Sequence, residues 1–118
     1  MTSMVIIGAG PGGYEAASVA AAGGVDVTVV EETGIGGAAV LTDCVPSKTL
    51  IATAEVTSTL RRAAELGLRH TETFEVDLDA VNSRVRQLAQ AQSDDISRGL
   101  ERKGCLLYTS DAADEEDS

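Results

Sequence analysis

The hydrophobic pattern of the first thirty residues predicts two strands with a helix between them. Met4–Ile7 is a continuous apolar run that ends at a glycine, which is typical of a buried strand of a parallel sheet. The alanine-rich stretch 14–24 (YEAASVAAAGG) predicts a helix packed close to the sheet and ended by its two final glycines. Val25–Val30 predicts the second strand. Together these segments form one βαβ unit.

Farther along, the pattern predicts two longer helices. A glycine-rich connection over residues 32–43 leads into a helix over residues 45–67, where Pro46 is tolerated in the first turn. We expect Gly67 to close this helix. The polar connection that follows contains His70, which we expect to be a solvated loop residue.

The second long helix is expected over residues 80–104, with Asp79 as its N-cap. Its apolar stripe consists of Val81, Val85, Leu88, Ile96 and Leu100. The fold class is therefore α/β: a Rossmann-like βαβ unit plus two longer helices. At 118 residues the chain is short for a complete nucleotide-binding domain, so we expect a truncated fragment of a larger fold. One sheet edge and part of the stripe should then be uncovered.

Charge and composition exclude several classes of function. The net charge of −10 argues against a nucleic-acid partner. A run of about 18 apolar residues is absent, so no membrane segment is expected. The start lacks a basic region before its first apolar run, so we predict no signal peptide and a cytoplasmic location. With two cysteines in a reducing compartment, no structural disulfide is expected.

The last fourteen residues carry five acidic residues and no basic one. In one interpretation, CLLYT is a third strand followed by an acidic, disordered tail. However, CLLYTSDAADE also resembles the translation of a transposon-type adapter used to prepare DNA for sequencing. We favour this second interpretation, in which residues 1–104 are a partial domain, residues 105–118 are not native, and Cys105 has no biological role. A strand there, beside the first one, would reflect chance β-propensity.

The turn after the first strand has the pattern of a phosphate-binding loop. Gly8, Gly10 and Gly13 spell G-x-G-x-x-G: the first permits a tight turn, the second lets backbone approach a pyrophosphate, and the third lets the helix lie close to the strand. We place Gly12 in the same candidate site. The diphosphate would bind at the helix N-terminus, where free N–H groups and the positive end of the dipole lie.

An acidic residue completes this pattern. Glu31 ends the second strand, eighteen residues after Gly13, where a carboxylate can accept hydrogen bonds from both ribose hydroxyls of an adenosine. The glycines could instead serve only the turn. The turn by itself does not distinguish FAD from NAD.

The segment 36–48 (GGAAVLTDCVPSK) resembles the redox motif of the flavoprotein pyridine nucleotide-disulfide oxidoreductases, such as lipoamide dehydrogenase and glutathione reductase. Members typically read G-G-T-C-x-x-x-x-C-x-P-S-K, and the resemblance extends from Met4 through Gly104. It implies that residues 1–104 are a partial FAD-binding domain with a Rossmann-like unit, in which the glycine turn holds the FAD pyrophosphate and Glu31 binds the adenosine ribose. NAD(P)H would be the co-substrate.

The resemblance also assigns roles inside the motif. The backbone around Gly37 and Ala38 would pass beside FAD, and Cys44 matches the cysteine nearer the flavin. Lys48 matches a lysine near the flavin N5, where a positive charge stabilises the reduced cofactor. The alternatives are that Lys48 is a surface lysine and that Cys44 is an inert packed residue.

Ala39 departs from the family pattern because it occupies the position of the cysteine that attacks the disulfide substrate. Disulfide exchange needs an attacking thiolate and a second thiol to resolve the mixed disulfide, so ordinary disulfide reductase activity should be absent. Two chemistries remain. FAD could pass electrons to a small acceptor such as a quinone, or Cys44 alone could reduce peroxide through a sulfenic acid.

The motif is most similar to that of lipoamide dehydrogenase-like NAD(P)H:quinone reductases, which lack this same cysteine. We therefore expect the parent to be an FAD-dependent NAD(P)H:quinone oxidoreductase that forms a homodimer through a C-terminal domain absent here. The fragment alone should be inactive. The alternatives are a non-catalytic FAD-binding module, or a simple NAD-binding dehydrogenase with no special role for Cys44 and Lys48.

Overall fold

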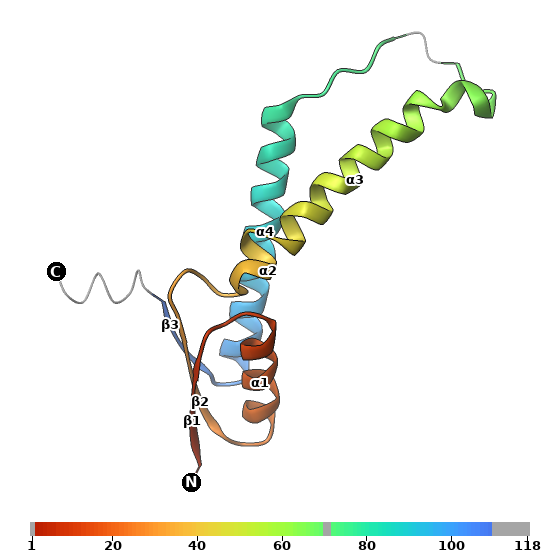
Figure 1. The fold of residues 1–118 in the computed structure, drawn as a ribbon. Helices are drawn as coiled ribbons and strands as arrows, with labels where there is room; N and C mark the ends of the chain where they lie inside the picture. The colour runs from red at the N-terminus through yellow and green to blue at the C-terminus, as the bar shows by residue number, and fades with distance from the viewer. Residues whose placement is uncertain (1, 70–71, 110–118) are drawn as a thin grey trace, which may run out of the picture.

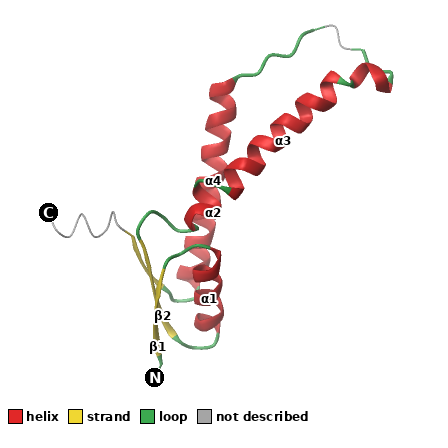
Figure 2. Ribbon diagram, viewed as in Figure 1, coloured by secondary structure: helices red, strands yellow, loops and turns green. Residues whose placement is uncertain are grey.

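The computed structural model describes residues 2–69 and 72–109, so the prediction for His70 lies outside the described residues. A small sheet carries helices on one side, and a pair of long helices projects away from it (Figure 1). Figure 2 shows the same view with the strands gathered at one end of the molecule. The elements are β1 (Ser3–Ile7), α1 (Pro11–Ala22), β2 (Asp26–Glu31), α2 (Gly37–Leu41), α3 (Cys44–Arg61), a 3₁₀ turn (Ala63–Leu66), α4 (Leu78–Arg102) and β3 (Leu106–Thr109).

The sheet is parallel with strand order β1-β2-β3. The predicted βαβ unit is confirmed, since β1 pairs with β2 in register from Ser3–Asp26 to Ile7–Val30. The third strand lies on the other side of β2, with Thr28 opposite Leu106. The strand at residues 106–109 therefore does not lie beside the first strand but, following α4, pairs with β2.

The core lies on one face of the sheet only. Val27 and Val29 of β2 are buried there, together with Ala17 of α1 and Leu100 of α4. On the opposite face Ile7 is 87% exposed, and Val5, Leu106 and Tyr108 are exposed as well. The prediction of a buried first strand is thus wrong for this chain, since no described element covers that face. The expectation of an uncovered sheet edge is confirmed at β1, which has a partner on one side only.

Helix α1 begins at Pro11, three residues before the predicted stretch 14–24, and ends at Ala22, where the two glycines were predicted to stop it. Pro11 occupies the first helical turn, where its missing N–H costs nothing. Gly23 is the C-cap, and Gly24 follows with φ +87°, a conformation that favours glycine. The small side chain of Ala17 is fully buried and allows the helix to lie close to the sheet.

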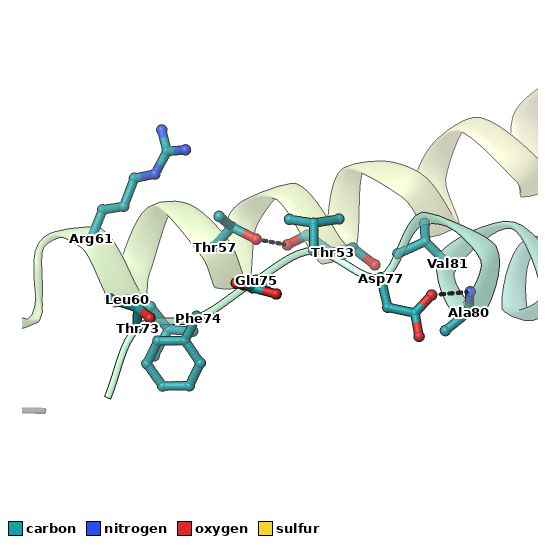
Figure 3. Close-up of a pocket in the computed structure, with 11 residues that line it drawn as sticks. Thr53, Thr57, Leu60, Arg61, Thr73, Phe74, Glu75, Asp77, Ala80 and Val81 are labelled. Atoms are coloured by element: carbon teal, nitrogen blue, oxygen red, sulfur yellow. Dashed lines mark hydrogen bonds between the residues drawn. The ribbon is translucent and has the colours of Figure 1, made fainter. Parts of the chain in front are cut away.

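The long helices differ in detail from the sequence prediction. The predicted connection contains the short helix α2, and α3 begins at Cys44, with Pro46 in its first turn as expected. Gly67, with φ +80°, ends the 3₁₀ turn after α3. The N-cap of α4 is Asp77, because its Oδ1 accepts the N–H of Ala80 at 3.0 Å (Figure 3).

Asp79 is therefore not the cap, and that prediction is wrong. An N-cap residue has extended backbone outside the helix, and Asp77 has this conformation, whereas Asp79 is already helical. In the first turn its negative charge faces the positive end of the helix dipole, which is favourable. The apolar stripe of α4 is buried at Leu100, but Leu88 is 40% exposed, as expected for a stripe that is only partly covered.

Candidate functional site

The turn between β1 and α1, residues 8–13, is here called the glycine turn. Gly8 has φ +103°, and its N–H donates to the carbonyl oxygen of Val30 at 2.7 Å, which joins the turn to β2. A Cβ built on Gly13 would lie 1.8 Å from the carbonyl oxygen of Gly8. Helix α1 can lie this close to the turn only because residue 13 has no side chain.

The space in front of the glycine turn, at the N-terminus of α1, is open. A Cβ on Gly10 or Gly12 would meet no atom within 4 Å, so space lies in front of the N-terminus of α1. The first turn of α1 carries no acidic side chain that would repel an anion or occupy its N–H groups. This space, the backbone N–H groups and the helix dipole fit the diphosphate of a dinucleotide.

Glu31 lies beside the glycine turn and is held by backbone donors. Its Oε1 accepts the N–H of Ala9 at 3.0 Å, and its Oε2 accepts the N–H of Thr33 at 3.1 Å. Partial burial raises the pKa of this carboxyl group, but hydrogen bonds from Ala9 and three residues after the strand lower it, and the net shift is downward. The side chain is therefore ionised at neutral pH, and each oxygen keeps a lone pair that can accept a ribose hydroxyl.

A groove of about 410 Å³ lies at the carboxyl ends of the three strands. Glu31 and Glu32 line it together with the apolar side chains of Ile7 and Val30 and with Tyr108 of β3. Ligands of open parallel sheets bind at this end of the strands. A flat apolar ring can pack on Ile7 and Val30 while a sugar attached to it reaches Glu31.

Residues 34–37, here called the crossing segment, pass against the glycine turn. The N–H of Gly36 donates to the carbonyl oxygen of Ala9 at 2.8 Å. Gly37 has φ +65°, and a Cβ there would lie 2.9 Å from the Cα of Gly10. Glycine at position 37 therefore lets α2 begin directly against the glycine turn, and the structure brings Gly37 together with Gly8, Gly10, Gly13 and Glu31.

Ala38, Cys44 and Lys48 lie farther along and face outward. Ala38 is exposed in α2, and its carbonyl oxygen accepts the N–H of Asp43 at 2.8 Å. Cys44 is the exposed first residue of α3, and Lys48 is exposed in the next turn. Within the described residues, no hydrogen bond or ion pair joins the Cys44 or Lys48 side chain to the glycine turn. Ala39, at the departure from the family pattern, is half-buried in α2.

Sequence reasoning missed two residues of this site. Gly36 supplies the hydrogen bond to Ala9, and Ser93 of α4 donates its hydroxyl to the carbonyl oxygen of Ile35. The signal for Ser93 was present, because it lies in phase with the apolar stripe of α4, between Ala89 and Ile96. A polar side chain at such a position is buried and needs a hydrogen-bond partner.

A larger groove of about 470 Å³ lies far from the glycine turn, between α3 and the segment before α4 (Figure 3). Thr53, Thr57 and Val81 line it, and Phe74 lies at its side. None of the predicted site residues line this groove, so we do not take it as the functional site despite its larger volume. No cluster of three or more metal-ligating side chains occurs among residues 2–69 and 72–109. None of the described helices is both long enough and apolar enough to cross a bilayer.

Comparison with known proteins shows which family the chain belongs to. Residues 2–111 match the family described as pyridine nucleotide-disulphide oxidoreductase. An NAD(P)H dehydrogenase (quinone) of Mycobacterium tuberculosis is 49% identical over 104 residues, which cover 85% of this chain and 21% of that protein. A dihydrolipoyl dehydrogenase of Chlamydia muridarum is 38% identical over 106 residues, which cover 90% of this chain and 22% of the relative.

The crystal structure of LpdA from Mycobacterium tuberculosis superimposes with a TM-score of 0.85 and 46% identity, covering 92% of this chain and 23% of that one. The HOCl-induced flavoprotein disulfide reductase RclA of Escherichia coli shares the fold, with a TM-score of 0.70 and 20% identity. The chain thus spans about a fifth of the length of the curated relatives that it matches. Because the family match runs from residue 2 to residue 111, the chain belongs to the pyridine nucleotide-disulphide oxidoreductase family.

Proposed function

We propose that this chain is the FAD-binding N-terminal part of an NAD(P)H:quinone oxidoreductase. The observation that carries this proposal is the open glycine turn at the N-terminus of α1, next to the ionised carboxylate of Glu31. The turn has room and donors for a diphosphate, and Glu31 has free lone pairs for a ribose. The similarity to a protein named NAD(P)H dehydrogenase (quinone) supports the choice of electron acceptor.

Each part of the site has a separate task in this proposal. Gly8, Gly10, Gly12 and Gly13 leave the backbone of the glycine turn free to bind the FAD diphosphate, and Glu31 holds the adenosine ribose. Bound FAD supplies two-electron chemistry: NAD(P)H, a proton and a quinone give NAD(P)⁺ and a hydroquinone.

The residues after α2 begins form one wall of the flavin site in this proposal. The backbone at Gly37 and Ala38 passes beside the cofactor, and Lys48 places a positive charge near its ring system. Lys48 is exposed in this chain, so its side chain can approach a bound ring system.

The cysteines argue against disulfide chemistry. Ala39 removes the attacking thiol, and Cys44 is exposed at the start of α3. The only other cysteine, Cys105, is buried in the core against Ala17, and burial raises the pKa of its thiol. Cys44 and Cys105 are both free, and a buried thiol cannot resolve a mixed disulfide at the surface.

An assay of the full-length parent tests this proposal. We expect NADH or NADPH to reduce a simple benzoquinone, with no measurable reduction of lipoamide or glutathione disulfide. The Cys44→Ser variant should retain at least about half of the quinone turnover, because the electrons do not pass through sulfur. The 118-residue chain should bind FAD without turnover. Brisk lipoamide reduction would contradict the proposal, and peroxide reduction that needs Cys44 would favour the single-cysteine alternative.

We further propose that residues 105–118 are not native. Their similarity to a translated sequencing adapter supports this. A strand as short as β3 can also form from β-propensity alone. An independent, uninterrupted DNA clone should depart from the present sequence just after codon 104. An identical sequence through codon 118 would refute this part.

A further inference from the structure

Ser93 is the one buried polar side chain among the described residues. Only 5% of its surface is exposed, and it lies in the middle of α4, where a solvent-facing serine would be the ordinary case. Its hydroxyl donates to the carbonyl oxygen of Ile35, which lies 58 residues earlier in the chain. This contact joins α4 to the crossing segment.

The hydrogen bond acts at the point where the crossing segment meets the glycine turn. Ile35 is itself buried in the core with Ala9. The next residue, Gly36, donates its N–H to Ala9, and Ala9 donates its own N–H to Glu31. Beyond the Ser93–Ile35 bond, two hydrogen bonds donated by backbone N–H groups, those of Gly36 and Ala9, lead to the carboxylate of the proposed ribose site.

The close contacts of the crossing segment leave little tolerance for movement. A Cβ built on Gly37 would lie 2.9 Å from the Cα of Gly10, so the two backbones pass too close to each other for a side chain at residue 37. A shift of the crossing segment away from the glycine turn would break the Gly36–Ala9 hydrogen bond. On its other side, α4 holds the crossing segment through the hydrogen bond from the Ser93 hydroxyl to Ile35.

We propose that Ser93 is a positioning residue for the dinucleotide: it holds Ile35, and through it fixes the crossing segment against the glycine turn that binds FAD. The inference rests on the proposed function. Ser93 does not touch the cofactor site itself, and its effect is transmitted through the backbone at residues 35 and 36. Without its hydroxyl the Ile35 carbonyl oxygen would be buried without a partner, and the crossing segment would move to expose it.

The test compares four variants of the 118-residue chain with the unmodified protein. Ser93→Ala removes the donor, and Ser93→Cys keeps a similar size with a weaker donor. Ser97→Ala is the matched control one turn along, because the Ser97 hydroxyl bonds only within α4, to the carbonyl oxygen of Ser93. Val85→Ala is a second control, since it trims a half-buried side chain of the same helix two turns earlier.

Two quantities are measured. Titration with FAD, followed by its fluorescence, gives the dissociation constant. Amide hydrogen exchange without FAD reports on the N–H of Gly36. We expect Ser93→Ala to weaken FAD binding about tenfold and to speed exchange at Gly36, with Ser93→Cys intermediate. Both controls should stay within about twofold. Circular dichroism checks folding, and if Ser93→Ala does not fold, Ser93→Cys decides by the same two measurements.

Three results would overturn the inference. One is an FAD affinity in both Ser93 variants that equals that of the unmodified chain. Another is equal weakening by Val85→Ala, because Ser93 would then act only through the stability of α4. The third is unchanged exchange at Gly36. If the unmodified chain binds no FAD at all, the proposed function fails, which is distinct from a failure confined to Ser93.

Discussion

Replacing Gly13 with alanine is expected to separate α1 from the sheet and abolish FAD binding. The added Cβ would lie 1.8 Å from the carbonyl oxygen of Gly8, and the neighbouring atom is backbone that cannot rotate away. Helix α1 must therefore move by more than 1 Å, since Cβ contacts below 3.0 Å essentially never occur. We expect a loss of about 3 kcal/mol in the free energy of unfolding, typical of overpacking at a tight contact.

The matched control for Gly13→Ala is Gly10→Ala. A Cβ at Gly10 meets no protein atom within 4 Å, and the φ of −73° at this position is accessible to any residue. The unfolding free energy should therefore change by less than about 0.5 kcal/mol. FAD binding should nevertheless weaken strongly, by about a hundredfold, because the methyl group occupies space proposed for the diphosphate.

Urea unfolding and FAD titration of both variants provide the measurements. The two variants should differ in stability: Gly13→Ala should lower both stability and FAD binding, whereas Gly10→Ala should lower FAD binding alone. A Gly10→Ala chain that binds FAD as tightly as the unmodified chain would remove the diphosphate from the glycine turn. A stable Gly13→Ala chain would contradict the packing of α1.

Replacing Glu31 with glutamine is expected to weaken FAD binding by about a hundredfold and to lower stability by about 2 kcal/mol. Hydrogen bonds to a charged acceptor contribute about 1.5–3 kcal/mol each, and glutamine offers one oxygen where the carboxylate offers two. The Glu31 carboxylate accepts the N–H groups of both Ala9 and Thr33, so the amide group of glutamine would leave one of them without an acceptor.

Glu32→Gln is the control for this change. Glu32 is the next residue, is exposed, and lines the same groove, so the substitution alters the net charge equally. We expect its FAD affinity to stay within about threefold of the unmodified chain. Equal losses in the two variants would assign the effect to the general charge of the groove instead of the geometry of Glu31.

The pH dependence of stability offers an independent measurement on Glu31. Its pKa in the folded chain lies below the ordinary value of 4.5, so the unfolded chain binds the proton more readily. The stabilisation is fully present above the unfolded pKa and is lost as the pH falls through the folded one. Urea unfolding from about pH 6 down to about pH 3 should show a shallower acid loss in Glu31→Gln than in the unmodified chain. Parallel curves would contradict the assignment.

Local patterns predicted the positions of the glycine turn after β1 and of Glu31 at the end of β2, because each depends on a short stretch of chain. A glycine turn needs residues of small size at fixed spacing, and the acid needs only to end the second strand. The same reasoning failed at Asp79, where two acids lie two residues apart and only the backbone conformation distinguishes the cap from the first turn. It failed at the buried first strand because burial depends on which elements cover the sheet, and no described element covers that face.

The sequence by itself determined the βαβ unit and the position of the glycine turn between its first strand and its helix. These follow from the period of hydrophobic positions and from residue types at fixed spacing, both of which are local properties. Only the tertiary structure decided that Gly36 meets Ala9 and that Ser93 meets Ile35, because hydrogen bonds between distant segments form once packing has brought these segments together. The same packing brings α4, far along the chain, into contact with the crossing segment through Ser93.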